Sequence, residues 1–249
     1  MSSILETVEW GKPAQTLLSY CNQVNPELPI IMHIRHTERP KATEETMKQA
    51  QKNGTSPLYS TERGKQAAYE FGQKLPKNKI YNIYHSPVKR TIETAEKIHE
   101  GLLSQKAVSK IKGVFFSANY NKQKQFEYLK RDIIDSGQPN ARQYFINHVN
   151  GHFPPWEIEP ALLVAKRHAF MMMKNVKNAS PENWDIYVSH DTVCSLFLFY
   201  WFGVMPDERW IEFLDGFIMQ LSDDRMHVFT KDGKKEAYYP YWWNFKRLE

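Results

Sequence analysis

The feature that most constrains the fold is a set of three short runs rich in β-branched and aromatic residues. They lie at Ile30–Ile34, Ile80–Tyr84 and Trp184–Val188, and each ends where polar residues begin. Runs of this length and composition, bounded by polar segments, are typical of buried β-strands. We therefore expect all three to lie inside one sheet.

The segments after the first two runs have the periodicity of amphipathic helices. Apolar residues recur at spacings of three, four or seven, which place them on one helix face, in two stretches: Ala67, Phe71 and Leu75, and then Val88, Ile92, Ala95 and Leu102. Strands that alternate with helices favour a parallel sheet. The sequence thus predicts an α/β fold, a three-layer sandwich in which helices flank a mostly parallel central sheet.

The rest of the chain suggests one domain over residues 1–249 with an insertion. Between about Gly113 and Pro160 the periodicity loosens, and we interpret this segment as an inserted lid. Beyond it we expect a helix at Ala161–Val176 and a strand pair at Gly216–Leu221 and Met226–Thr230, joined by an SDDR turn.

Composition excludes several classes of protein. The net charge of +5 comes from 33 basic and 28 acidic residues that are mixed along the chain, and no reading motif for nucleic acid is present. The longest apolar stretch, Val193–Met205, is too short to cross a bilayer and is better explained as a buried helix. The first residues carry Glu6 and Glu9 where a secretory leader would be basic and then apolar. We therefore expect a cytoplasmic protein that binds neither membrane nor nucleic acid.

Polar residues follow each of the three predicted strands. The motifs RHTERP, HSPVKR and SHDT begin at Arg35, His85 and Ser189 respectively. Because ligands collect at the carboxyl ends of strands in parallel sheets, these motifs are expected to converge. Arginine guanidinium groups bind phosphoryl oxygens in pairs, and a neutral imidazole is a nucleophile. The pattern indicates phosphoryl transfer.

At these residues the chain resembles the histidine phosphatase superfamily, which contains phosphoglycerate mutases and histidine acid phosphatases. The resemblance rests on Arg35-His36, LYSTERGKQA from Leu58, SPVKRTIETAE from Ser86, and SHDT, in the family's order. It implies a phosphoglycerate mutase-like fold with His36 as the phosphorylated residue. It also implies that Arg35 and Arg90 hold the phosphate, that His190 completes the site, and that no metal or other cofactor is needed.

The proton donor has two candidate sources. Arg39 and the His190-Asp191 pair resemble the acid phosphatase branch, which implies Asp191 as the acid and Arg39 as a further phosphate ligand. The SPxxR spacing and the modest length resemble the mutase branch, whose acid is a glutamate of the insertion, and Glu157 or Glu159 would then serve. Thr37 stands where the family usually has glycine.

We therefore expect hydrolysis of a small phosphorylated substrate through a phosphohistidine on His36. Two alternatives stay open: a mutase-like phosphotransferase, and a phospholigand-binding module without turnover. The identity of the substrate is not encoded in a recognisable motif, and self-association into a homo-oligomer stays open as well.

Overall fold

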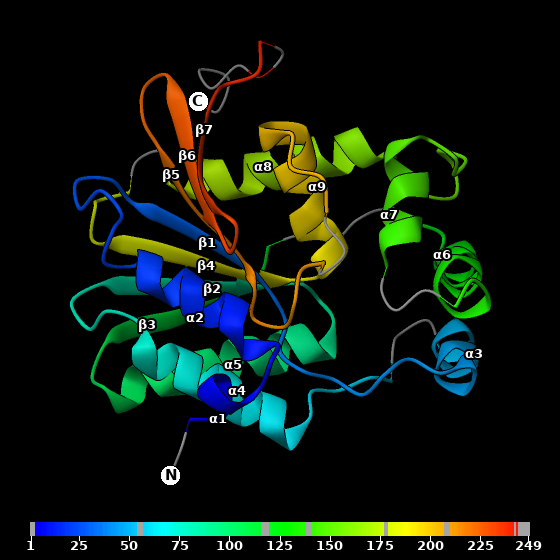
Figure 1. Cartoon of the computed structure of the whole chain (residues 1–249), viewed down its shortest axis with the longest axis horizontal. Helices are drawn as coiled ribbons and strands as arrows, with labels where there is room; N and C mark the ends of the chain where they lie inside the picture. Colours follow the sequence, from blue (N-terminus) through cyan, green and yellow to red (C-terminus); the bar gives the residue numbers. More distant parts are fainter. Residues whose placement is uncertain are drawn as a thin grey trace.

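The computed structural model describes residues 3–53, 57–115, 120–137, 141–176, 179–206, 210–241 and 243. Within these residues a seven-stranded mixed sheet has the order β3-β2-β4-β1-β5-β6-β7 (Figure 1). Its strands are β1 (Ile30–Arg35), β2 (Ile80–His85), β3 (Val108–Val114), β4 (Asn183–Ser189), β5 (Gly216–Leu221), β6 (Arg225–Thr230) and β7 (Gly233–Tyr238).

The first four strands in this order are parallel to one another. Strands β5, β6 and β7 each pair antiparallel with the strand before them in this order. The three predicted central strands and the predicted strand pair are confirmed. Strands β3 and β7 were not predicted, because both lie at edges of the sheet. In β3 exposed and half-buried residues alternate, so its lysines face solvent and mask the apolar pattern.

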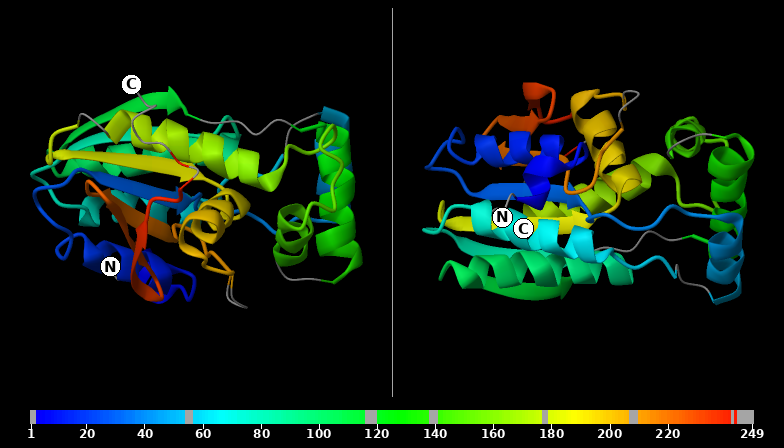
Figure 2. Two further views of the ribbon diagram at one scale, coloured as in Figure 1. Left: turned by 90° about the horizontal axis from the view of Figure 1, so that it is seen from above. Right: turned by 60° about the horizontal axis from the view of Figure 1, so that its bottom comes forward.

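Helices cover both faces of the sheet, which confirms the predicted three-layer α/β architecture (Figures 1 and 2). One face packs against α2 (Gly11–Tyr20), α4 (Glu62–Lys74) and α5 (Lys89–Ser104), with the short α1 (Ile4–Thr7) beside them. The other face packs against α8 (Ala161–Val176) and α9 (Asp191–Phe202). Each helical layer closes its own hydrophobic core against the sheet, so the central strands are buried on both faces.

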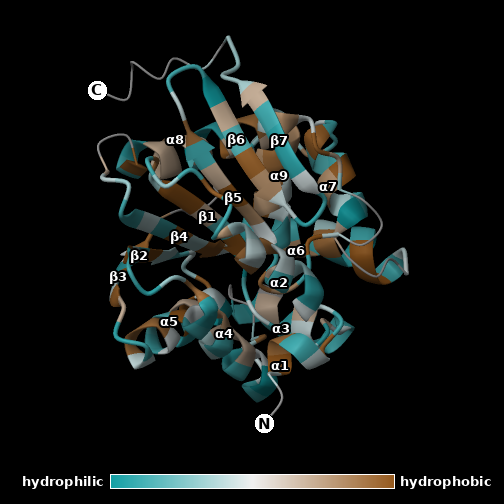
Figure 3. Cartoon of the chain, turned by 60° about the vertical axis from the view of Figure 1, so that its left-hand side comes forward, coloured by the Kyte–Doolittle hydropathy of each residue, from teal (hydrophilic) through white to brown (hydrophobic). Residues whose placement is uncertain are grey.

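Helix α9 is the predicted buried apolar helix. Figure 3 shows it mainly in the hydrophobic colour. Its last residue is followed by Gly203, whose φ of 63° is a conformation that glycine adopts freely. No helix among the described residues is long and apolar enough to span a membrane.

The remaining helices stand beyond the edge of the sheet at which β1 and β2 end (Figure 2). They are α3 (Glu44–Asn53), α6 (Lys122–Leu129), the π-helix η1 (Lys130–Asp135) and α7 (Arg142–Val149). The last three belong to the predicted insertion, of which residues 116–119 and 138–140 lie outside the described residues, and β3 extends into its predicted start. Helix α3 packs against α6 and η1, so a second segment, which follows β1, joins the insertion.

The contact between α4 and α5 depends on two glycines, Gly72 and Gly101. A Cβ atom at Gly101 would lie 2.1 Å from the backbone oxygen of Tyr69, closer than any real contact. Gly101→Ala is therefore expected to lower the free energy of unfolding by about 1–3 kcal/mol through overpacking. Urea denaturation measures this, with the exposed Gln66→Ala as the control. If the urea midpoint of Gly101→Ala equals that of the control, the prediction is wrong, and the two helices can move apart without loss of stability.

Candidate active site

Strand register brings the three predicted motifs to one edge of the sheet. Arg35, the last residue of β1, pairs with Ser189 of β4, and His85 of β2 pairs with Val188. The residues that follow these strands therefore emerge side by side, as parallel strands require. His36, Ser86 and His190 are the first residues beyond the three strands.

Arg35 is held by the segment Trp210–Asp215, which carries no motif that would have identified it from the sequence. The backbone N–H of Arg35 donates to Asp215 O at 2.8 Å, and Arg35 O accepts from the Leu214 N–H at 3.2 Å. Its guanidinium donates to Ile211 O and lies 4.4 Å from the centroid of the Phe213 ring. The buried guanidinium thus has a fixed plane and direction.

Two residues of this segment, Trp210 and Leu214, have a φ of 57°. Left-handed backbone costs energy in a non-glycine residue and is concentrated at functional sites. Because the usual signal for this conformation is a glycine, neither position could have been recognised from the sequence.

The nucleophile proposed from the sequence, His36, is buried and oriented by two hydrogen bonds. Its backbone N–H donates to Ser189 O at 2.9 Å, and its Nδ1 lies 2.7 Å from Thr37 O. A carbonyl only accepts, so Nδ1 carries the proton and Nε2 presents its lone pair, to which Arg90 Nε donates at 2.9 Å. Burial, and then the charges of Arg90 and Arg35, hold the pKa of His36 well below its usual value. The imidazole is therefore neutral, as a nucleophile must be.

The second histidine, His190, caps the start of α9. Its Nδ1 lies 3.4 Å from Arg90 Nη2, its Nε2 lies 3.1 Å from Ser86 Oγ, and its ring centroid lies 5.5 Å from that of His36. Burial, followed by the charge of Arg90, lowers the pKa of His190 to about 3. The guanidinium of Arg90 thus stands between the two imidazoles and bonds to both.

Three arginines, Arg35, Arg39 and Arg90, surround the imidazoles. Burial and then Arg39 lower the pKa of Arg90 to about 9, which leaves it cationic at neutral pH. Burial and then Arg35 lower the pKa of Arg39, whose Nη1 donates to Pro40 O at 2.6 Å. Each of these arginines has a buried N–H group with no acceptor among the described residues: Nε of Arg35, Nε of Arg39 and Nη1 of Arg90. Buried donors of this kind favour an anionic ligand with several oxygens.

Among the described residues, the carboxylate of Asp191 lies directly against this cluster. Asp191 Oδ2 is 3.3 Å from Arg35 Nη2, and its Oδ1 accepts from the Thr192 N–H at 2.8 Å. Burial raises the pKa of Asp191, but the charge of Arg35 and the hydrogen bonds to the carboxylate outweigh it, so the net shift is downward. In the unliganded protein Asp191 is therefore ionised.

The alternative donors, Glu157 and Glu159, have partners outside the cluster. Glu157 accepts from the Tyr128 hydroxyl of α6, and Glu159 accepts from Arg167 Nη2 of α8 at 2.6 Å. An antiparallel bridge between Tyr120 and Ile158 fixes the strand-like segment that carries both glutamates. Each carboxylate is thus engaged in holding the inserted segment.

Thr37 is completely buried where the family usually has glycine. Its hydroxyl donates to Gly64 O at 2.7 Å, and its N–H donates to Thr94 Oγ1 at 3.0 Å. The side chain therefore ties the loop after β1 to α4, and both contacts face the helical layer.

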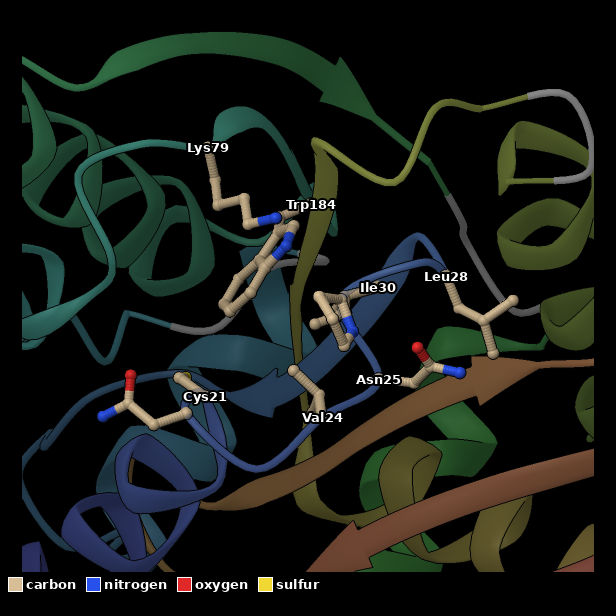
Figure 4. Close-up of a pocket in the computed structure, with 9 residues that line it drawn as sticks. Cys21, Val24, Asn25, Leu28, Ile30, Lys79 and Trp184 are labelled. Atoms are coloured by element: carbon tan, nitrogen blue, oxygen red, sulfur yellow. The ribbon is translucent and has the colours of Figure 1, made fainter.

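A cavity of about 210 Å³ lies elsewhere, at the start of β1 and β4 (Figure 4). Its lining includes Cys21, Ile30, Lys79 and Trp184. It belongs to the opposite end of the sheet from the cluster around His36. Among the described residues no group of three or more histidine, cysteine or carboxylate side chains is arranged to hold a metal ion.

Sequence comparison agrees with this geometry. Residues 31–216 match the model of the histidine phosphatase superfamily (branch 1). The chain belongs to this superfamily. No curated protein sequence matched the chain. The resemblance stated from the motifs is thereby confirmed at the level of the superfamily, and the matched region contains all the cluster residues described above.

Solved structures of similar fold include phosphoglycerate mutase from Bacillus anthracis, with 13% identity, a TM-score of 0.47, and coverage of 86% of this chain and 94% of that one. Phosphoserine phosphatase from Entamoeba histolytica has 14% identity, a TM-score of 0.45, and coverage of 86% and 98%. A mycobacterial glucosyl-3-phosphoglycerate phosphatase has 15% identity, a TM-score of 0.49, and coverage of 86% and 98%.

Proposed function

We propose that this superfamily member hydrolyses a small phosphomonoester through a phosphohistidine on His36, with Asp191 as the proton donor to the leaving group. The observation that carries the proposal is the state of His36. Its Nδ1 is fixed as a donor, its Nε2 lone pair faces Arg90, and buried arginine N–H groups without acceptors surround it.

In the first step, His36 Nε2 forms a bond to phosphorus while the bond from phosphorus to the ester oxygen breaks. The guanidinium groups of Arg35, Arg39 and Arg90 stabilise the charge on the three equatorial oxygens. The leaving oxygen takes a proton from Asp191. In the second step, Asp191 removes a proton from water, and the water oxygen displaces His36 to give inorganic phosphate.

The position of Asp191 supports this role, because it is the carboxylate paired with a phosphate-binding arginine. Arg35 keeps Asp191 ionised at rest, so the donor form has to be created when substrate binds. A phosphoryl dianion beside Arg35 offsets the positive charge that lowers the pKa of Asp191. The fraction of protonated Asp191 then increases as the pH falls, and turnover is expected to be favoured on the acid side of neutrality.

The test is release of inorganic phosphate from an aryl phosphate, measured with and without a chelator of divalent metals. We expect turnover in both conditions. Rapid quenching during turnover of a ³²P-labelled substrate is expected to trap a phosphoenzyme that is stable in alkali and labile in acid. A phosphoenzyme stable in acid, or the complete absence of turnover with every phosphomonoester of a broad panel, would contradict the proposal.

The same panel separates the two alternative functions. A mutase-like phosphotransferase would exchange phosphate between substrate positions with little release of inorganic phosphate. A binding module would bind phosphorylated compounds but form no phosphoenzyme. The panel includes sugar phosphates, nucleotides, inositol phosphates and phosphopeptides.

A further inference from the structure

The hydrogen bonds around His190 form a chain whose proton positions can be inferred from the carbonyl acceptors at its start. The chain begins at Thr91, which is completely buried, and whose Oγ1 lies 2.7 Å from Val88 O and 2.9 Å from Ser86 O. Both carbonyls only accept, so the Thr91 hydroxyl proton points to them. The Ser86 hydroxyl, 2.9 Å from Thr91 Oγ1, must therefore donate to Thr91.

This arrangement fixes the tautomer of His190. Because the Ser86 proton is directed at Thr91, Ser86 Oγ accepts from His190 Nε2, which must carry the ring proton. The opposite nitrogen, Nδ1, faces Arg90 Nη2, and a guanidinium only donates. Both contacts thus require the same neutral tautomer, with the lone pair on Nδ1 directed toward the arginine cluster.

That tautomer is unsuited to an anion. When Arg90 turns its N–H groups to a bound dianion, the Nδ1 lone pair faces negatively charged oxygen. Moving the ring proton from Nε2 to Nδ1 would cost the hydrogen bond to Ser86. The Ser86 hydroxyl could not donate to the deprotonated Nε2, because its own proton is directed at Thr91. The arrangement becomes favourable if Nδ1 gains a proton of its own.

We propose that His190 takes up a proton at Nδ1 when a tetrahedral dianion binds among Arg35, Arg39 and Arg90, and that Ser86 is the positioning residue that enforces this coupling. The inference rests on the proposed function only in that the site accepts a phosphoryl-like dianion. The proton comes from solvent, and the bound species is a doubly protonated imidazolium that donates to the anion.

Among the described residues, the charged and titratable groups that act on His190 are His33 inside β1, Arg35 and His36 around its end, Arg39 from the loop that follows, Arg90 from α5, and Asp191 from α9. Burial and the fixed cations Arg35, Arg39 and Arg90 keep His190 neutral in the free protein. A dianion offsets two positive charges, so its binding is what permits protonation. Anion affinity should therefore increase as the pH falls, by up to about tenfold per pH unit for one linked proton.

The experiment is calorimetric titration with sulfate, which stays a dianion over the pH range 5–8. Protons taken up per sulfate are obtained from titrations in buffers of different ionisation enthalpy. We expect the wild-type protein to take up protons when it binds sulfate. In His190→Asn, whose amide donates a hydrogen bond without carrying a charge, uptake should be lower by about one proton, and sulfate affinity should depend less on pH. Ser86→Ala frees the ring to place its proton on Nδ1, so it should also take up less than the wild type.

Two control variants make the outcome specific. Asp191→Asn should still show the proton uptake that depends on His190. Ser104 lies at the end of α5 and donates to Gly101 O, so Ser104→Ala should match the wild type. Proton uptake unchanged in His190→Asn but lost in Asp191→Asn would overturn the inference, as would sulfate binding without any uptake. Neither result would affect the proposed hydrolysis, which phosphate release tests separately. If the protein fails to bind sulfate, the inference about His190 is overturned. If it also fails to turn over any phosphomonoester, the proposed function is overturned as well.

Discussion

His36→Ala is expected to reduce phosphate release by at least about 10⁴-fold, because removal of a covalent nucleophile leaves only the binding contribution of the remaining site. In the proposed mechanism the imidazole Nε2 of His36 is the atom that forms the bond to phosphorus, and alanine has no atom that can take its place. The same variant should form no acid-labile phosphoenzyme. Single-turnover quenching with labelled substrate measures both losses.

The control for this variant is His99→Ala. His99 lies on α5 and bonds to Ser109, away from the arginine cluster, so its turnover should equal that of the wild type. Thermal unfolding of both variants checks that they are folded. A folded His36→Ala protein that retains the wild-type rate, or still becomes phosphorylated with the same acid lability, would rule out His36 as the nucleophile.

The second large effect is expected for Asp191→Asn, and its size should depend on the leaving group. For alkyl phosphates, whose alkoxide needs a proton, the rate should fall about 10²- to 10⁴-fold, the usual contribution of general acid catalysis. For an aryl phosphate with an acidic phenol the loss in the phosphorylation step should be much smaller. The asparagine keeps the size of the side chain while it removes the titratable group.

The pH dependence of alkyl phosphate turnover gives an independent measure. Because Arg35 lowers the pKa of Asp191, the wild-type rate should decrease as the pH rises, and Asp191→Asn should remove that decrease. Asp224→Asn, in the exposed turn between β5 and β6, is the control. Glu157→Gln and Glu159→Gln should show no dependence on the leaving group; such a dependence in either one would move the donor role to the inserted segment.

The sequence was informative about the sheet and the histidine cluster because both depend on short local patterns. Buried parallel strands are nearly continuous apolar runs, and the residues just beyond them are forced together by strand register. The motifs at the strand ends therefore group His36, Arg90 and His190 from local pattern alone. The structure also brings Arg39 within electrostatic reach of Arg35, Arg90 and His36.

Other parts of the site depend on contacts that leave no local pattern. The segment Trp210–Asp215 binds Arg35 through three backbone atoms, which are the same for every residue type, in addition to the ring of Phe213. Helix α3 joins the insertion through packing between segments that are far apart in the sequence, Glu44–Asn53 against Lys122–Asp135. The role of Ser86 appears only once its neighbours are known, because a serine hydroxyl donates or accepts according to its surroundings.

The sequence by itself therefore determined the α/β class, the order of the central strands along the chain, and the histidines and arginines that meet at one sheet edge. Local apolar periodicity and covalent adjacency are sufficient for these. Only the tertiary structure decided the protonation states: a neutral His36 that carries its proton on Nδ1, an ionised Asp191, and a His190 tautomer set by Ser86. Protonation depends on burial and on charges from distant segments, and the chain acquires both only when it folds.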